Sequence, residues 1–228
     1  MRASGRRRER VIAVLRAPDA ARFVAVTSVL ADAGLVKLEF TLTSAGALEA
    51  ITAVKRAMPH LAIGCGTART SDDIRRAADA GADFVVSQYF DPALGDAALA
   101  AAIDYVPGAL TPGEIARAAV DAELVKVSPI GPVGGVAYLR ELVGPLPDIP
   151  LFPTGGVRPD ELGAYFDAGA AFVGVSALLL QDALTGGDLD ALGARAREAL
   201  SALADTEPDT DPDADPDLAP ASPSKGHA

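Results

Sequence analysis

The feature that most constrains this chain is a regular alternation of two kinds of segment between residues 11 and 203. Short apolar segments rich in β-branched residues, which favour strands, are each followed by an alanine-rich amphipathic stretch, which favours a helix. Strands are expected at 11–15, 36–40, 62–64, 84–86, 102–105, 124–127, 151–153 and 172–175. Helices are expected near 20–33, 45–58, 71–80, 93–100, 112–120, 134–143, 159–168, 177–183 and 188–203. Eight such βα units in about 190 residues predict a single-domain α/β protein, a (β/α)8 TIM barrel.

The turn after the first expected strand argues against the main alternative, an open doubly wound sheet. A nucleotide-binding sheet of that kind needs a glycine-rich turn there. The chain instead reads Arg16-Ala17-Pro18-Asp19, which contains no glycine. Three helical stretches end at an alanine–glycine pair, as a left-handed helix cap requires, and a new strand follows within a few residues.

The two ends of the chain differ from its body in composition. Residues 1–10 are arginine-rich, and residues 204–228 are rich in aspartate, proline and alanine. The latter segment cannot offset its ordering entropy by burial, so it is expected to be a disordered tail. The net charge of −11 argues against a nucleic-acid partner. No apolar run is long enough for a membrane-spanning helix or a signal peptide, which predicts a cytoplasmic protein with no membrane partner.

Few residues could ligate a metal. The single cysteine, Cys65, excludes an intramolecular disulfide, and the two histidines, His60 and His227, are far apart in the sequence. We therefore expect neither a metal site nor a cofactor.

Catalytic side chains of a (β/α)8 barrel lie at the carboxyl ends of its strands, and one lysine stands out by this rule. The chain has four lysines, and Lys126 lies near the end of the sixth expected strand, flanked by valines. Burial disfavours the charged form of an amine, and the neutral amine can attack a carbonyl to form a Schiff base. The alternative is a structural lysine that reaches the barrel mouth or pairs with an acid.

Glu39 is the candidate acid/base group. It lies late in the second expected strand, and by the two-residue period of a strand it shares a face with Lys37. A carboxylate beside an amine inside the barrel can transfer protons during catalysis. The alternative is a structural ion pair with Lys37 or Lys126. Lys37 is also the rival Schiff-base lysine, but it lies earlier on its strand, nearer the barrel floor.

Two other strand ends carry groups suited to a small anionic substrate. Arg16 follows the first strand, where a guanidinium can bind a carboxylate through two hydrogen bonds; the alternative is an ordinary surface arginine. The third strand ends in Gly64-Cys65-Gly66-Thr67, which offers a hydroxyl and two glycines that let the backbone approach a ligand. Cys65 has no adjacent histidine and is expected to be a buried packing residue.

The last two strands end in residues suited to phosphate. Thr154, Gly155 and Gly156 follow the seventh strand, and Ser176 follows the eighth. Barrels often bind phosphate in these two loops, through backbone amides at a helix start. An acidic protein can bind an anion in this way, because the amides and dipoles act locally.

The order and spacing of these motifs resemble a known family. The chain is similar to the 2-keto-3-deoxy-6-phosphogluconate / 4-hydroxy-2-oxoglutarate aldolases over about residues 10–200. The similarity rests on the ordered segments IAVLR (12–16), LEFTL (38–42), IGCGT (63–67), PG (107–108), VKVSP (125–129), FPTGG (152–156) and VGVS (173–176). The resemblance implies a class I aldolase on a (β/α)8 barrel, a homotrimer without a metal, which acts on a small anionic 2-keto acid.

The resemblance also implies a role for each candidate residue. Lys126 would form the Schiff base, Glu39 would be the acid/base group, and Thr67 would help hold the carboxylate of the pyruvyl part. The phosphate would lie among Thr154, Gly155, Gly156 and Ser176.

Three positions depart from the family pattern, and all are expected to line the substrate pocket. Thr43 stands where many members have a substrate-binding arginine, while Arg16 matches the arginine that the related 6-phosphogalactonate aldolases use instead. Ser128 replaces a phenylalanine two residues after the lysine, and Gln88 replaces a proline after the fourth strand. These departures bear on the choice of substrate more than on the lysine chemistry.

The expected reaction is therefore cleavage of a 2-keto-3-deoxy (phospho)sugar acid, or of 4-hydroxy-2-oxoglutarate, to pyruvate and an aldehyde. Two alternatives stay open. One is an isomerase, epimerase or synthase that acts on a phosphorylated metabolite at the same strand ends. The other is a non-catalytic binding protein of the same fold.

Overall fold

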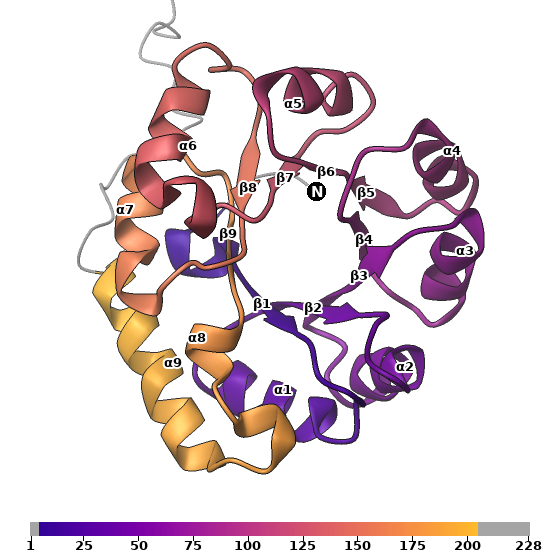
Figure 1. The fold of residues 1–228 in the computed structure, drawn as a ribbon. Coiled ribbons are helices and arrows are strands. Elements are labelled where there is room, and N and C mark those ends of the chain that lie inside the picture. The colour runs from indigo at the N-terminus through magenta and orange to yellow at the C-terminus, as the bar shows by residue number, and fades with distance from the viewer. Residues whose placement is uncertain (1–4, 205–228) are drawn as a thin grey trace, which may run out of the picture.

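The alternation of strands and helices predicted from the sequence is present in the computed structural model, which describes residues 5–204. Figure 1 shows the strands placed around one centre, with the helices on the outside. The strands are β1 (Val11–Leu15), β2 (Lys37–Thr41), β3 (Ala62–Ala68), β4 (Phe84–Ser87), β5 (Asp104–Val106), β6 (Gly108–Ala109), β7 (Val125–Val127), β8 (Leu151–Pro153) and β9 (Val173–Val175). Each paired strand runs parallel to its neighbours, so the carboxyl ends within a sheet share one edge.

The prediction of a closed eight-stranded barrel is wrong. The strands form a six-stranded sheet in the order β5-β4-β3-β2-β1-β9 and a separate three-stranded sheet in the order β6-β7-β8. One break falls at Pro107, between β5, which pairs with β4, and β6, which pairs with β7. Proline has no N–H to donate to a ladder. At the other break, between β8 and β9, the amides of Ala171 and Phe172 both donate to the Leu151 carbonyl, so successive residue pairs do not form.

The helices lie between the strands, as expected, and cover the outside of the ring of strands in Figure 1. The α-helices are α1 (Phe23–Asp32), α2 (Ala47–Ala57), α3 (Ser71–Asp79), α4 (Pro92–Ala100), α5 (Pro112–Ala118), α6 (Gly135–Val143), α7 (Leu162–Asp167), α8 (Ala177–Leu180) and α9 (Leu189–Ala204). Short 3-10 helices are η1 (Arg7–Arg10), η2 (Gly131–Val133), η3 (Pro159–Glu161) and η4 (Ala183–Thr185). The glycines after α1, α3 and α7 have φ angles of 104°, 87° and 96°, which confirms the predicted left-handed caps.

The apolar core has two parts. The larger one packs strands against helices, for example the Phe40 ring of β2 against the Phe23 ring of α1, with ring centres 5.0 Å apart. The smaller one contains residues of the strands and of the positions just before them, and no helix residue: Ile12, Val14, Phe84, Val86, Val106, Leu124, Phe152, Ala171 and Phe172. We call this second group the inner cluster. It fills the centre of the ring of strands. A polar side chain on the same strand faces is therefore surrounded by apolar side chains.

The expected tail at 204–228 lies outside the described residues except for Ala204, the last residue of α9. Within the basic segment expected at 1–10, residues 7–10 form η1. Among the helices of the described part, none is both long and apolar enough to cross a membrane.

Candidate active site

Lys126 and Glu39 come together inside the molecule from strands of different sheets. Lys126 is the middle residue of β7, two residues after Leu124 of the inner cluster, and Glu39 of β2 pairs in register with Val14 of the same cluster. The Lys126 Nζ lies 3.7 Å from Glu39 Oε1, and the two side chains are 4% and 0% exposed. The structure therefore brings the two candidate catalytic side chains into one buried ion pair.

The carboxylate of Glu39 has little to stabilise it apart from this lysine. Neither oxygen accepts a hydrogen bond from any other residue within 5–204, although both are buried. A buried carboxylate without hydrogen-bond donors costs several kcal/mol in an ordinary core, roughly the desolvation penalty of an ion. Such an arrangement is typical of a functional site, where the free oxygens can accept a proton or a hydrogen bond from a ligand.

Two glycines of β3 make room inside the ring of strands. A Cβ at Gly66 would lie 2.7 Å from Glu39 Cγ and still closer to Oε1, and a Cβ at Gly64 would lie 2.6 Å from Phe84 Cδ2. The sequence interpretation was that these glycines let the backbone approach a ligand. They instead leave space for the Glu39 carboxylate and the Phe84 ring. Sequence reasoning missed this role for Gly66, and its only signal was two glycines two apart on one strand face.

The rival lysine, Lys37, is the first residue of β2, two residues before Glu39. Its Nζ donates a 2.8 Å hydrogen bond to the Glu9 carbonyl and lies 5.9 Å from the centre of the Phe172 ring. Burial lowers the pKa of Lys37, and the negative charge of Glu9 opposes that shift. The sequence left two ion pairs open for Glu39, one with Lys37 and one with Lys126. The structure contains the pair with Lys126.

Thr67 and Arg16 meet at the carboxyl ends of β3 and β1. The Arg16 Nη2 donates a 3.1 Å hydrogen bond to Thr67 Oγ1. The pairing of β3 with β4 shifts between Gly66 and Ala68, and Thr67 has a φ of 63°. A left-handed backbone is a true outlier for a β-branched residue and costs roughly 1–3 kcal/mol. Such bulges often redirect a side chain next to an active site.

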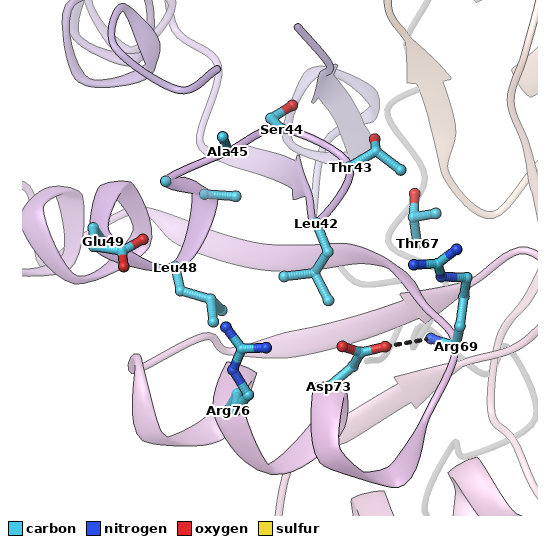
Figure 2. A pocket seen from close by; sticks show the side chains of 12 residues that line it. Leu42, Thr43, Ser44, Ala45, Leu48, Glu49, Thr67, Arg69, Asp73 and Arg76 are labelled. Carbon is cyan, nitrogen blue, oxygen red and sulfur yellow. Dashed lines mark hydrogen bonds between the residues drawn. The ribbon is translucent and has the colours of Figure 1, made fainter. Parts of the chain in front are cut away.

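Thr43 lies near Thr67 in a cavity of about 320 Å³ between the ends of β2 and β3 and the helices α2 and α3. Figure 2 shows Thr43 and Thr67 at one end of this cavity and Glu49 at the other. The Thr43 hydroxyl lies 3.2 Å from the hydroxyl of Thr41. Arg69 and Arg76 also line the cavity, and sequence reasoning identified neither.

The four residues expected around phosphate follow β8 and β9. Thr154 is buried, and a Cβ at Gly174 would lie 2.7 Å from its Oγ1, so its side chain packs on β9 two residues before Ser176. Gly155 and Gly156 have φ angles of 83° and 87°, and their amides donate no hydrogen bond to an acceptor in the part of the chain described. Ser176 Oγ donates to the Val14 carbonyl at 2.7 Å. These loops therefore offer two free amide donors beside a buried hydroxyl.

The other two departures from the family pattern lie together. The Gln88 side-chain amide donates a 3.4 Å hydrogen bond to the Ser128 carbonyl. Both residues line a second cavity, of about 300 Å³, at the ends of β4, β6 and β7, together with Tyr89 and Glu114. Ser128 lies two residues after Lys126, so this cavity adjoins the lysine strand.

Cys65 is a buried residue of β3 whose thiol is not activated as a nucleophile. Burial, followed by the negative charge of Glu39, raises the pKa of the Cys65 thiol to about 12. Cys65 is fully buried, as expected of a packing residue. Across residues 5–204, no group of three or more histidine, cysteine, aspartate and glutamate side chains is placed to hold a metal ion.

Comparisons with known proteins identify the family. The model of the KDPG and KHG aldolases matches residues 3–194. The 2-dehydro-3-deoxy-phosphogluconate aldolase of Pseudomonas aeruginosa is 33% identical over 201 residues, which cover 87% of this chain and 91% of that protein. The KHG/KDPG aldolase of Escherichia coli is 32% identical over 180 residues, which cover 78% and 84%.

A solved structure agrees with the sequence comparisons. The 2-keto-3-deoxy-6-phosphogluconate aldolase of Zymomonas mobilis, solved with 3-phosphoglycerate, is 27% identical, with a TM-score of 0.76 over 86% of this chain and 92% of that chain. Family model, relatives and fold all point the same way. The chain therefore belongs to the KDPG and KHG aldolase family, whose members are carbon–carbon lyases.

Proposed function

We propose that Lys126 forms the Schiff base of this aldolase and that Glu39 moves the protons of the cleavage. The observation that carries the proposal is the buried ion pair: Nζ and Oε1 lie 3.7 Å apart, and Glu39 has no hydrogen-bond donor in the described chain. A carboxylate in contact with the amine can take its proton and release the neutral nucleophile. The substrate is a 2-keto-3-deoxy (phospho)sugar acid or 4-hydroxy-2-oxoglutarate.

The reaction balances with these two side chains and water. The neutral Lys126 amine attacks the 2-keto carbon, and loss of water leaves a protonated imine. The imine accepts the electron pair of the C3–C4 bond while Glu39, directly or through a water, takes the proton of the C4 hydroxyl. An aldehyde leaves, and the remaining enamine is protonated at C3. Water then hydrolyses the imine, which releases pyruvate and restores the amine.

The surrounding residues would bind the two anionic ends of the substrate. Arg16 and Thr67 meet at the ends of β1 and β3, which suits them to the carboxylate next to the keto group. Thr43 would line the same end of the pocket. A phosphate would lie between the β8 and β9 loops, where the residues are Thr154, Gly155, Gly156 and Ser176. The free amides of the two glycines support this position.

The test of the lysine assignment is covalent trapping. Borohydride reduction in the presence of pyruvate is expected to add one reduced pyruvyl group, located on Lys126 by peptide mass spectrometry. Lys126→Arg keeps a cation opposite Glu39 but cannot form an imine, so it is expected to lose both adduct and activity. Lys37→Arg is the matched control and keeps both. An adduct on Lys37, or no adduct, would overturn the assignment.

We also infer that the enzyme acts as a homotrimer in the cytoplasm. The resemblance to the family supports the trimer. Light scattering of the full chain is expected to give three times the chain mass of 23.1 kDa. A mass of one chain would contradict the trimer, and recovery of the enzyme outside the cytoplasmic fraction would contradict the location.

A further inference from the structure

We propose that Arg69 is a further substrate-binding residue, which holds the carboxylate of the 2-keto acid together with Arg16 and Thr67. The inference rests on the proposed function, because it concerns the keto acid that Lys126 would bind. It goes beyond that function in assigning a role to a residue that the motifs of the chain do not include.

The position of Arg69 is the first argument. It follows the last residue of β3 and lines the cavity of about 320 Å³ that also contains Thr67 and Thr43. Figure 2 shows its guanidinium beside Thr67, at the end of the cavity nearest the strand ends. The guanidinium makes no hydrogen bond or ion pair with another of the described residues. A guanidinium has five donors, all of which are therefore available to a ligand.

Arg69 is the charged side chain beside Thr67 in the cavity. Asp73 is the nearest acid, and its Oδ2 accepts the backbone amide of Arg69 at 3.0 Å and that of Thr70 at 3.1 Å. This carboxylate therefore caps α3 and fixes the backbone from which Arg69 projects. Figure 2 shows the Arg76 guanidinium pointing toward Leu48, away from Thr67. The cations closest to Thr67 are Arg69, by its position in Figure 2, and Arg16, by its hydrogen bond.

The donors around Thr67 suit a carboxylate. Arg16 donates to Thr67 Oγ1, and no described acceptor takes the hydroxyl proton of Thr67, which is free to donate to a ligand. Thr67 therefore has the Arg16 guanidinium bonded to its hydroxyl and the Arg69 guanidinium beside it in the cavity. A carboxylate has two oxygens and about four lone-pair sites, and planar guanidinium groups bind it through paired hydrogen bonds.

The position of Thr67, next to the residue that adjoins the Glu39 side chain, suits a 2-keto acid. Its carboxylate is bonded directly to the carbon that Lys126 would attack, so the carboxylate site must adjoin the ion pair of Lys126 and Glu39. Thr67 follows Gly66, where an added Cβ would clash with the Glu39 side chain. The left-handed φ of 63° at Thr67 sets the direction of the chain at this point, and Arg69 follows two residues later.

The experiment measures the pyruvate concentration that gives half-maximal borohydride trapping on Lys126, by mass spectrometry of the full chain. Arg69→Leu removes the guanidinium, and Arg69→Lys keeps a cation without the planar fork. Arg75→Leu is the matched control: it removes one positive charge from α3, but Arg75 is exposed and pairs with Asp72. Methyl pyruvate, which lacks the carboxylate charge, is titrated in parallel.

We expect Arg69→Leu to raise the half-maximal pyruvate concentration about tenfold, the effect of losing one charge-assisted hydrogen bond at a solvent-accessible site. Saturating pyruvate still labels Lys126 fully in this variant. The half-maximal concentration for Arg69→Lys should lie between those of the unmodified chain and Arg69→Leu. For Arg75→Leu, the half-maximal pyruvate concentration should stay within about twofold of that of the unmodified chain. With methyl pyruvate, the half-maximal concentrations of all variants should agree with that of the unmodified chain to within about twofold.

Three results would overturn the inference while the proposed function stands: an unchanged pyruvate titration in Arg69→Leu, an equal loss in Arg75→Leu, or an equal loss with methyl pyruvate. If the unmodified chain gives no adduct on Lys126, the proposed function fails and this inference fails with it.

Discussion

Replacing Gly66 by alanine tests whether the position of the Glu39 carboxylate controls catalysis. The added Cβ would lie 2.7 Å from Glu39 Cγ and closer still to Oε1. Carbon atoms pack at about 3.5 Å or more, so the Glu39 side chain must move by at least about 0.8 Å at Cγ, and by more at the carboxylate. Gly66 has no left-handed φ, so the clash, and not backbone strain, is the perturbation.

The size of the effect follows from this displacement. A misplacement of a reacting group by about 1 Å lowers the rate by roughly 100-fold. Overpacking of a core by one methyl group costs about 1–3 kcal/mol of unfolding free energy. We therefore expect Gly66→Ala to fold with a lowered Tm, to lose about 100-fold in kcat, and still to form the Lys126 adduct with pyruvate, because Lys126 itself is not displaced.

The assay is pyruvate release from 2-keto-3-deoxy-6-phosphogluconate, measured well below the Tm of each variant. Gly113→Ala in α5 is the control, because no heavy atom lies within 4 Å of its added Cβ. It is expected to keep full activity and to gain about 0.5–1 kcal/mol of stability, the helix preference of alanine over glycine.

A second variant separates the clash from other causes. Glu39→Asp shortens the side chain and so reduces the clash with an alanine at position 66. The fold-loss of kcat in the double variant should therefore be smaller than the product of the fold-losses in the two single variants. Wild-type kcat in Gly66→Ala, or fully independent losses in the double variant, would refute the reasoning.

Three further predictions concern single residues. Glu39→Gln is expected to lower kcat by about 10²- to 10⁴-fold in the pyruvate-release assay while Lys126 trapping persists, and an unchanged kcat would remove Glu39 from the mechanism. Thr67→Gly relieves left-handed strain of about 1 kcal/mol, so calorimetry should show a Tm higher by about 2–4 °C alongside weaker pyruvate trapping; a lower Tm would contradict the strain. Because burial raises the pKa of Cys65 from about 9 to about 12, iodoacetamide should not alkylate it at pH 8 until the chain is unfolded. Unfolding then favours loss of that proton, so this thiol should lower stability as pH rises from about 9 to 12, and Cys65→Ala should make the fall less steep.

Local pattern was sufficient to predict most helices and strands of this protein. The predicted strand 11–15 coincides with β1, and the helix predicted at 71–80 differs from α3 by one residue. Apolar periodicity and glycine caps act over a few neighbouring residues, so they can be read without the rest of the chain. The two-residue strand β6 escaped prediction, because Gly108 and Ala109 have no apolar alternation and become a strand only by pairing with β7.

The candidate site was predictable in part for the same reason. Strand position and residue type identified Lys126 and Glu39, and the motif order identified Thr67. Gly66 and Arg69 carry no pattern of their own. The roles inferred for them depend on which side chains lie next to them inside the ring of strands and in the cavity. Contacts between residues distant in the sequence determine those neighbours.

The sequence by itself determined the alternating elements, the parallel pairing and the short series of candidate residues at the strand ends. The tertiary structure decided how the strands close, since Pro107 and the single Leu151 acceptor interrupt the ladders at two places. It also determined which lysine lies beside Glu39, because Glu39 pairs with Lys126 while Lys37 bonds to the Glu9 carbonyl. Periodicity assigns a side chain to a face, but only the packed fold brings two faces within the few ångströms over which proton transfer acts.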